Sequence, residues 1–552
     1  MSDVRQTELG FTENIPIERV HGALLGAAVG DALGWPQEQN SGRMGSFPEP
    51  SETLTFQPWR RKGGYRFEAY EEHIKAGEYS DDTQLLIATA RSILRGKNWA
   101  HTLSRHELPL WLLYERGGGG ATKRAARAWL SGRTPWTQPK KQLQSYFNAG
   151  GNGVAMRILP HVLKPGQARA QMMRDVMRNG ILTHGHPRAL LGAIVYAHAA
   201  WWITHTSTPL PFGGAIHDLL DQRTEWEVLP RNTESSTSGW LEAADQAFSK
   251  DYEIEWKQTV QEICDGLRMI HKVIHEEGAL LNDRAVLERI GCFGKTNGSG
   301  VVATLAVLYL FSVYAPDPVT GLRAIAFAKS ADTDTLASML GGLFGLTHGL
   351  DWIPTTLQHV QDYDLIRDIA DHLTRSSFSG EGEYIPRWSD QDAQQAIETL
   401  QTSQEGDDLP LGILGNTEVI SHRSLQPLTR TVLHADEWYL RTDTGQTIYI
   451  TQPQRTPSVE SSNQREAGAT GEDREPLNRV QAYHGLSEEA VQSVLHILRV
   501  ALQSPIESTD ALQAATGDQW NNLTNADHQA IIARMERFIQ VMRESGSVKT
   551  CM

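Results

Sequence analysis

Two short acidic segments have residue types that could do chemistry. "SDDT" at residues 80–83 and "DTDT" at residues 332–335 each come just before an apolar run. Ser and Asp are common helix N-caps, and carboxylates suit the positive end of a helix, so capping explains either segment taken alone. Hydroxyl and carboxylate oxygens are also the ligands that Mg²⁺, Mn²⁺ or Ca²⁺ prefers. A pair of divalent ions would balance the carboxylates if the segments meet, so at this point both interpretations stay open.

Three glycine-rich segments could allow a ligand to approach the backbone closely. "GGNG" at 150–153 could form an amide cradle for phosphate, although a simple turn explains this segment equally well. "NGSG" at 297–300 leads into an apolar run, which predicts a helix N-terminus suited to phosphate. "GGGG" at 117–120 follows no strand and precedes no Gly-Lys-Ser/Thr, so a flexible connection is expected rather than a P-loop.

Ligands for soft metals are sparsely placed. His184 and His186 lie two residues apart in "LTHGHP", but Pro187 and the oxygen-only character of the acidic segments argue against zinc. The three cysteines are far apart and form no CxxC, which favours neither a zinc ribbon nor a disulfide framework. A reducing compartment fits this usage.

The elements that must position these segments have a helical pattern from about residue 17 to about residue 400. Small residues recur in apolar stretches such as "HGALLGAAVGDALG", which predicts closely packed helices, and alternating strand patterns are scarce. After residue 404, alternation around Thr444-Gly445 predicts a hairpin. We therefore expect an all-α, compact orthogonal core at 15–400, a small β element at 405–455, a polar flexible linker at 456–478 and a C-terminal helical module at 479–546.

The composition is that of a soluble globular protein. The chain has 552 residues, of which 40% are hydrophobic and 21% charged, and its formal charge is −15. That negative field argues against general nucleic-acid binding. The most apolar runs, such as 301–313, are shorter than the ~20 residues that a membrane span needs, and the N-terminus has no signal-peptide pattern. We expect a cytoplasmic protein without a membrane partner.

Several segments in order resemble the ADP-ribosylglycohydrolase family, which includes the dinitrogenase reductase-activating glycohydrolase. The matching segments are "GALLGAAVGDALGWPQE", "GEYSDDTQLLIATARSIL", "ERGGGGATKRAARAWLSG", "GGNGVAMRILPHVL", "LTHGHPRALLGAIVYAHA", "NGSGVVATLAVLYLF" and "SADTDTLASMLGGLFGL". They run from about residue 20 to about residue 350. The resemblance implies an ADP-ribosylglycohydrolase-like fold and metal-dependent hydrolysis at the distal ribose C1, which releases ADP-ribose.

The resemblance also implies a ligand set for two divalent ions, expected to be Mg²⁺ with Mn²⁺ as the alternative. The ions would bind the 2- and 3-hydroxyls of the ribose, and a carboxylate near the scissile bond would help an oxocarbenium-like state. Glu38, Asp82 and Asp334 are the expected catalytic residues, with an acid/base or gating role for Glu38. Asp31 is expected to be structural, or to support a metal ligand, and not to be catalytic. The expected metal ligands are Ser80, Asp81, Asp82, Asp332, Asp334 and Thr335.

By the same resemblance, the glycine-rich segments and one histidine would bind ADP-ribose. The expected residues are Gly151, Asn152, Gly153, His184, Gly298, Ser299 and Gly300. The chain departs from relatives that carry Ser-Tyr before this Gly-Asn, which leaves Tyr146 or Phe147 to stack on adenine. It also has Ser330-Ala331 where relatives often have two glycines.

Three functions are compatible with these residues. The leading one is an enzyme acting on an ADP-ribosylated substrate, expected to be a protein. A non-catalytic ADP-ribose reader or structural relative is the second, but such proteins tend to lose metal ligands and this chain retains all six. A hydrolase of a nucleic-acid or small-molecule conjugate is the third. The C-terminal extension could recruit a partner or substrate, cap the active site or mediate oligomerisation, and its acidic, tethered character favours contact with a protein over contact with nucleic acid.

Overall fold

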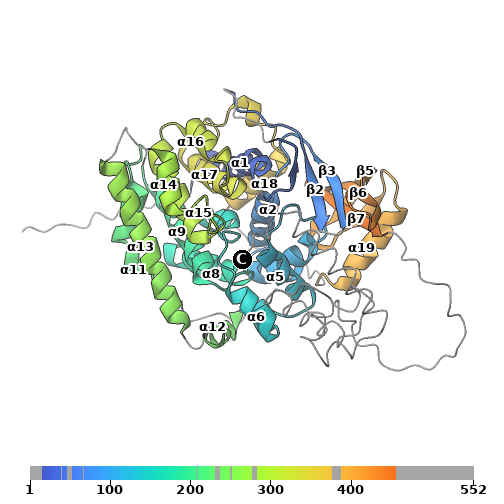
Figure 1. Ribbon diagram of the computed structural model, residues 1–552, viewed down its shortest axis with the longest axis horizontal. Helices are drawn as coiled ribbons and strands as arrows, with labels where there is room; N and C mark the ends of the chain where they lie inside the picture. Colours follow the sequence, from blue (N-terminus) through green and yellow to red (C-terminus); the bar gives the residue numbers. More distant parts are fainter. Residues whose placement is uncertain are drawn as a thin grey trace, which may run out of the picture. The chain divides into compact units, whose positions relative to one another are not determined.

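The computed structural model describes residues 15–38, 40–46, 53–65, 68–207, 209–230, 237–248, 251–276, 282–375 and 387–455. These residues belong to one compact unit, Met1–Ser458, which Figure 1 shows in colour. The second unit, Val459–Met552, lies outside the described residues, and so do the predicted linker and C-terminal helical module.

Helices form most of the described chain, which confirms the predicted all-α core (Figure 1). The longer ones are α1 (Ile17–Gly34), α2 (Asp81–Leu94), α5 (Gly120–Leu130), α6 (Lys140–Phe147), α8 (Arg169–Ile181), α9 (Pro187–His205), α10 (Gly214–Asp221), α12 (Trp240–Ala247), α13 (Tyr252–Glu276), α14 (Asp283–Ile290), α15 (Gly300–Tyr314), α16 (Pro318–Ala326), α17 (Thr333–His348), α18 (Tyr363–Leu373) and α19 (Asp390–Thr402). Single-turn helices are α3 (Trp99–Thr102), α4 (Leu108–Trp111), α7 (Leu159–Val162) and α11 (Arg223–Trp226). No helix in the described ranges has both the length and the apolar character to cross a bilayer.

The two helices α1 and α17 pack backbone to backbone and lie side by side in Figure 1. Glycines on α1 face small residues on α17, and a Cβ at Gly26 would collide with the carbonyl of Gly341. At the far end of the pair, the Thr333 hydroxyl donates to the carbonyl of Gly34 at 2.8 Å. The last residue of α1 therefore lies against the first residue of α17.

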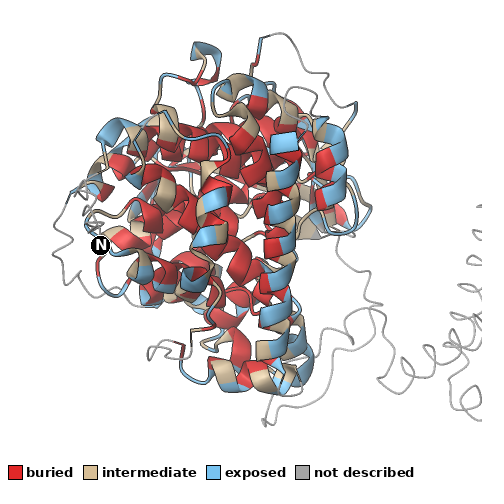
Figure 2. Ribbon diagram, turned by 90° about the vertical axis from the view of Figure 1, so that its left-hand side faces the viewer, coloured by how far each residue is buried: buried red, intermediate tan, exposed pale blue. Residues whose placement is uncertain are grey.

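Buried residues run through the central helices, as the red ribbons in Figure 2 show. α9 and α15 are buried around almost their whole circumference, which explains their nearly uniform apolar sequences. α15 starts against α9, since the Thr304 hydroxyl donates to the carbonyl of Gly192 at 2.9 Å.

A three-stranded antiparallel sheet lies between α1 and α2 in the sequence, and the sequence analysis did not foresee it. Its strands are β1 (Arg43–Met44), β2 (Trp59–Tyr65) and β3 (Glu68–Ile74), in that order. β2 reads "WRRKGGY", so charges and glycines hide its alternation. β2 is held in the sheet by its pairing with β1 and β3. The ring of Trp59 also packs edge-on against Trp35, with the ring centroids 5.1 Å apart.

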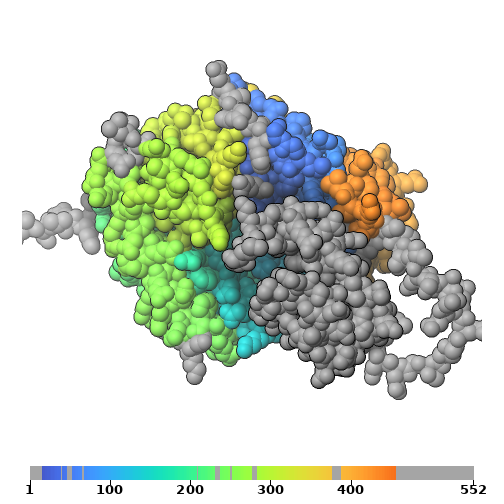
Figure 3. All heavy atoms as spheres, in the orientation of Figure 1, coloured from blue at the N-terminus to red at the C-terminus, as the bar shows by residue number. Residues whose placement is uncertain are grey.

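The predicted β element is a four-stranded antiparallel sheet. Its strands are β4 (Asp408–Pro410), β5 (Asn416–Leu425), β6 (Val432–Thr442) and β7 (Thr447–Arg455), in that order. β6 and β7 form the expected hairpin, with Gly445 in the left-handed region at φ 91°. Tyr70 of β3 bridges to Pro427, so the two sheets adjoin, as the blue and orange surfaces do in Figure 3.

Candidate active site

The "SDDT" segment forms the start of α2 and is hydrogen-bonded to Asp31 of α1. The hydroxyl of Ser80 accepts from the amide of Asp82 at 3.2 Å, so the capping interpretation is correct. Asp31, fully buried on α1, accepts from the amides of Ser80 at 3.1 Å and Thr83 at 3.0 Å. It also accepts from the Thr83 hydroxyl at 2.6 Å. These bonds agree with the structural role expected of Asp31.

The "DTDT" segment forms the start of α17 and lies beside Glu38. Asp334 accepts from the amide of Thr335 at 2.9 Å, and Asp332 precedes the helix. Because Thr333 is bonded to Gly34, this helix start lies next to the segment that leads from α1 to Glu38. Carboxylate oxygens of Glu38, Asp332 and Asp334 lie within 4.8 Å of one another, so together they could hold a metal ion.

The two acidic segments meet, which was the condition left open by the sequence. The carboxylate of Asp82 is hydrogen-bonded to the side chain of Thr335. Burial raises the pKa of Asp82 well above its usual value, and the charges of Asp31, Asp81 and Asp332 raise it further. Within the described part of the chain, Asp82 Oδ1 is buried with no hydrogen-bond partner.

Burial and neighbouring negative charges also raise the pKa values of two other carboxyl groups at this site. Burial, followed by the charges of Asp332 and Asp81, raises the pKa of Glu38 to about 8. Burial, followed by the charge of Glu115, raises the pKa of Asp81 to about 8. A cluster of buried oxygen donors with an unpartnered carboxylate oxygen fits hard divalent ions, which would favour the ionised carboxylates.

The two other glycine-rich segments pair with each other beside the acidic segments. Gly151 and Ser299 form an antiparallel bridge, and the amide of Asn152 donates to the carbonyl of Gly298 at 2.9 Å. The side-chain amide of Asn152 donates to Asp332 Oδ2 at 3.0 Å. The predicted ADP-ribose-binding segment is therefore attached directly to the predicted metal-binding segment. Ser299 Oγ is another buried atom without a partner among the described residues.

His184 borders the same glycine segment. A Cβ at Gly153 would lie 3.2 Å from His184 Cε1, while His184 Nδ1 lies 2.8 Å from the Thr183 hydroxyl. Burial lowers the pKa of His184 to about 3, so the imidazole is neutral near pH 7. A neutral imidazole can donate or accept a hydrogen bond without adding charge. His186 caps α9 instead and accepts from the amide of Arg188 at 3.1 Å.

Arg157 is a site residue that the sequence analysis missed. Its guanidinium is fully buried and donates to the Gly153 carbonyl at 2.7 Å and to the Thr183 hydroxyl at 2.8 Å. Burial lowers the pKa of Arg157 to about 9. It thus fixes both the glycine segment and the residue before His184. Its signal in the sequence was an arginine directly after "GGNGVAM", in an otherwise apolar stretch.

The "GGGG" segment also borders the acidic residues. Gly117 has φ 95°, and a Cβ there would lie 3.3 Å from both Asp81 Oδ1 and Trp35 Nε1. Glu115 accepts from the amide of Gly118 at 2.9 Å and from Lys123 at 3.0 Å. Only glycine suits position 117, because it combines the left-handed backbone with close approach to Asp81.

The four-stranded sheet is hydrogen-bonded to the residues that precede the "SDDT" segment. The hydroxyl of Tyr449 on β7 donates to Glu78 at 2.5 Å, and Arg116 donates to the other oxygen of Glu78 at 2.9 Å. Next along the chain, Tyr79 donates to Asp362 at 2.6 Å, and Asp362 also accepts from the amide of Thr447. The two residues before Ser80 are therefore both tied, directly or through one residue, to β7.

Tyr146 and Phe147, the two residues suggested to stack on adenine, differ in their surroundings. Phe147 is fully buried, so the expectation that it could stack on a ligand is wrong. The hydroxyl of Tyr146 donates to the Ile181 carbonyl at 2.7 Å and accepts from Trp240 at 2.8 Å. Tyr146 borders a pocket of about 230 Å³ with Arg124 of α5, and it stays the candidate.

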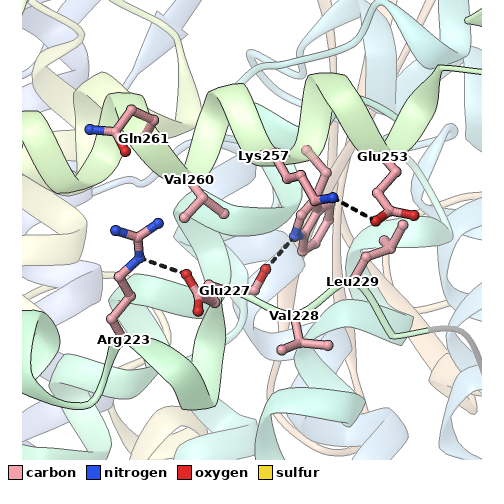
Figure 4. A pocket seen from close by; sticks show the side chains of 9 residues that line it. Arg223, Glu227, Val228, Leu229, Glu253, Lys257, Val260 and Gln261 are labelled. Atoms are coloured by element: carbon pink, nitrogen blue, oxygen red, sulfur yellow. Dashed lines mark hydrogen bonds and ion pairs between the residues drawn. The ribbon is translucent and has the colours of Figure 1, made fainter.

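A separate pocket of about 500 Å³ lies between α11 and α13 (Figure 4). Arg223 pairs with Glu227 at 2.6 Å, and Lys257 pairs with Glu253 at 2.9 Å. Trp256 donates to the Glu227 carbonyl at 2.7 Å. None of the predicted site residues lines this pocket, and its charges satisfy one another.

The chain is similar to several known proteins. A family model described as ADP-ribosylglycohydrolase matches residues 12–382. The chain is 23% identical over 380 residues to "ADP-ribosylhydrolase ARH3" of Danio rerio, across 65% of this chain and 90% of that protein. It is 30% identical over 172 residues to "ADP-ribosyl-[dinitrogen reductase] glycohydrolase" of Rhodospirillum rubrum, across 31% of this chain and 52% of that protein.

Two further proteins are also similar to this chain. The chain is 28% identical over 353 residues to "Uncharacterized protein YegU" of Escherichia coli (strain K12), across 62% of this chain and 91% of that protein. A solved structure titled "ADP-ribosylglycohydrolase-related protein complex" aligns with a TM-score of 0.39 and 22% identity, across 65% of this chain and 98% of that chain. The family match alone spans well over half of the sequence, including every acidic and glycine-rich segment described above. The chain therefore belongs to the ADP-ribosylglycohydrolase family.

Proposed function

We propose that this chain is a metal-dependent hydrolase that cleaves the glycosidic bond at the distal ribose C1 of an ADP-ribosylated substrate and releases ADP-ribose. The observation that carries the proposal is the meeting of the two acidic segments. Oxygens of Glu38, Asp332 and Asp334 lie within 4.8 Å of one another, and Asp82 is bonded to Thr335.

Six oxygen-bearing residues would hold two divalent ions, with Mg²⁺ as the expected ion and Mn²⁺ as the alternative. They are Ser80, Asp81, Asp82, Asp332, Asp334 and Thr335. Divalent ions in such a site act as Lewis acids and lower the pKa of a bound water. The partnerless Asp82 Oδ1 supports this assignment, because a buried carboxylate oxygen otherwise loses the bonds it had in water.

The chain's own residues would assist in three ways. Glu38 lies beside Asp332 and Asp334, close to where the ribose would be held, which suits it to an acid/base or gating role. The carboxylates of Asp82 and Asp334 would favour positive charge developing on the ribose. Buried hydrogen bonds of Asp31 would hold the acidic segment in place, and those of Arg157 would hold the glycine segment in place.

The paired glycine segments would bind the ADP-ribose moiety. Gly151, Gly153 and Gly298 carry no side chain that would block the approach of a ligand to the backbone. Gly300 begins α15, but it packs against the backbone of α9 and its amide donates to the Gly150 carbonyl at 3.0 Å, so it would position this helix start and not face the ligand. Neutral His184 would offer a hydrogen bond to the diphosphate or ribose. We propose an ADP-ribosylated protein as the substrate, as the name of the Rhodospirillum relative describes for that enzyme.

The test is release of ADP-ribose from Arg-, Ser- and nucleotide-linked substrates by the full chain. Asp82→Ala and Asp334→Ala should each abolish release, and EDTA should do the same until Mg²⁺ is restored. Asp265→Ala is the matched control, because Asp265 lies exposed on α13 and pairs only locally with Arg268. Unchanged turnover in EDTA would refute the metal requirement.

The same experiment separates the alternatives. Binding of ADP-ribose without turnover of any substrate would identify a reader instead of a hydrolase. Turnover of the nucleotide-linked substrate alone would assign the chain to a different conjugate.

A further inference from the structure

Three histidines from two helices gather at a pocket that takes no part in the proposed hydrolysis. The pocket has a volume of about 320 Å³ and is lined by Trp202, Phe212, His217, Asp221, His271 and His275, among others. His217 and Asp221 lie on α10, while His271 and His275 lie on α13. None of these residues belongs to the candidate active site.

The spacing of the rings suits a shared ion. His271 and His275 are one helical turn apart, with ring centroids separated by 4.2 Å, and the ring of His217 lies 6.5 Å from that of His271. Imidazoles that bind one Zn²⁺ at 2.0–2.1 Å in tetrahedral geometry have ring centroids about 5 Å apart. The two observed separations lie on either side of this value.

The three imidazoles do not yet converge on one point, so binding a shared ion would require their side chains to rotate. Among the described residues, only Glu38, Asp332 and Asp334 already gather three ligand atoms within 4.8 Å. His217 and His275 are exposed, so rotation of their rings meets little resistance. The helices need not move, because α10 and α13 are already packed together.

A carboxylate is placed to orient one of the rings. Asp221 Oδ2 lies 3.1 Å from Nδ1 of His217, which leaves Nε2 of that ring available. Histidines that bind metal commonly donate their other ring nitrogen to a carboxylate, which fixes the tautomer and the ring plane. Phe212 lies nearly parallel to His275 at 6.3 Å and covers one side of the cluster.

We propose that His217, His271 and His275 form a binding site for a transition-metal ion of the Zn²⁺ or Ni²⁺ type, with Asp221 orienting His217. Imidazole nitrogens select such ions, whereas the all-oxygen candidate active site suits Mg²⁺ or Mn²⁺. Burial and the neighbouring histidines lower the pKa of His271, which favours the neutral ring that a metal requires. A bound ion would tie the end of α13 to α10.

The test is titration of the full chain with Ni²⁺ by calorimetry near pH 7.5, in saturating Mg²⁺ so that the carboxylate site is occupied. The wild-type chain should bind one equivalent more than the double variant His271→Gln/His275→Gln, and His217→Gln should weaken that binding at least tenfold. His372→Gln, an exposed histidine on α18, is the matched control and should bind as the wild type does.

Two further readouts keep the outcome decisive. Ni²⁺ binding at this site should weaken as the pH is lowered, because protons compete with the metal for imidazole nitrogens. The double variant should retain the thermal stability of the metal-free wild type and its Mg²⁺-dependent release of ADP-ribose, so failure of this site is distinct from failure of the proposed function. Equal stoichiometry and affinity in wild type and double variant would overturn the proposal.

Discussion

The buried carboxylate of Asp31 is the residue on which the geometry of the "SDDT" segment depends. It accepts hydrogen bonds from three donors of that segment, the amides of Ser80 and Thr83 and the Thr83 hydroxyl. The same bonds offset part of the cost of burying Asp31, whose pKa burial raises.

Removing one of these donors should measure that support. Thr83→Val keeps the shape of the side chain but deletes a 2.6 Å bond to Asp31 in a fully buried place. We expect a loss of about 1–3 kcal/mol in the free energy of unfolding, measured by denaturant titration, together with weaker Mg²⁺ binding.

A matched control lies on the same helix. Thr89 is also fully buried on α2, and within the described residues its hydroxyl has no hydrogen-bond partner. Thr89→Val should therefore leave stability unchanged or raise it. Similar losses in both variants would show that Asp31 gains nothing special from Thr83.

The carboxyl groups also predict how stability depends on pH. The pKa values of Glu38 and Asp81 are raised to about 8, so the folded metal-free chain keeps protons that the unfolded chain releases from about pH 4 upward. Its stability should fall as pH rises from about 4 to about 8. Mg²⁺ favours the ionised carboxylates, so it should raise the melting temperature more at pH 8 than at pH 5.5.

Thermal unfolding in EDTA and in Mg²⁺ at several pH values checks this prediction. The Asp82→Asn variant should show a smaller Mg²⁺ shift at pH 8. A melting temperature in EDTA that rises steadily from pH 5 to pH 8 would contradict the assigned pKa directions.

At the scale of elements, the close pair of α1 and α17 decides where the second acidic segment lies. Glycines let the two backbones touch, and the pair ends where the Thr333 hydroxyl meets the Gly34 carbonyl. Asp332 and Asp334 begin α17, and Glu38 follows shortly after α1. Packing of small residues therefore sets the distance between the carboxylates.

A methyl group inside this contact should disturb both stability and the site. Gly26→Ala places a Cβ against the carbonyl of Gly341, and backbone atoms on both sides must shift. We expect a loss of about 1–3 kcal/mol in the free energy of unfolding and reduced ADP-ribose release. Gly294→Ala is the control, because a Cβ there meets no atom within 4 Å.

Chemical denaturation followed by activity measurements under folding conditions would resolve the two effects. If Gly26→Ala were as stable and active as Gly294→Ala, the close packing would not be required for the site.

At the scale of the whole molecule, the four-stranded sheet lies beyond the family match at 12–382 but packs into the same core. Trp438, Leu440 and Ile448 are buried in the main hydrophobic cluster of the helical domain. Gln446 accepts from Arg91 at 2.6 Å, and Tyr449 donates to Glu78. The composition of the chain changes near residue 404, where a domain boundary was predicted. Side chains from both sides of that position nevertheless pack in one hydrophobic core.

Truncation should reveal this difference. A chain ending after Ser458 keeps the compact unit and should melt as the corresponding part of the full chain does. A chain ending after Gln404 exposes the cluster's apolar surface and leaves Glu78 without Tyr449, so we expect aggregation or a much lower melting temperature. Equal solubility and melting of the two truncated chains would contradict an integral role for the sheet.

Local features of the sequence were sufficient to predict several parts of this protein. The helix start at "SDDT", the small residues in packed helices and the hairpin at Thr444-Gly445 follow from capping, periodicity and turn chemistry, which act over a few residues. A helix also starts at "DTDT" as predicted, although the Asp332 side chain makes no cap hydrogen bond there. The oxygen-rich ligand chemistry was likewise visible in the residue types. Strands β1 to β3 were missed because β2 carries charges and glycines and depends on its neighbours.

Only the tertiary structure decided that distant segments meet. The bond between Asp82 and Thr335, the anchoring of Ser80 and Thr83 by Asp31, and the attachment of Asn152 to Asp332 all join residues far apart in the chain. No local propensity encodes such contacts, because they depend on how whole helices pack. The same holds for burial, which removed Phe147 as a ligand contact and revealed Arg157 beneath the glycine segment.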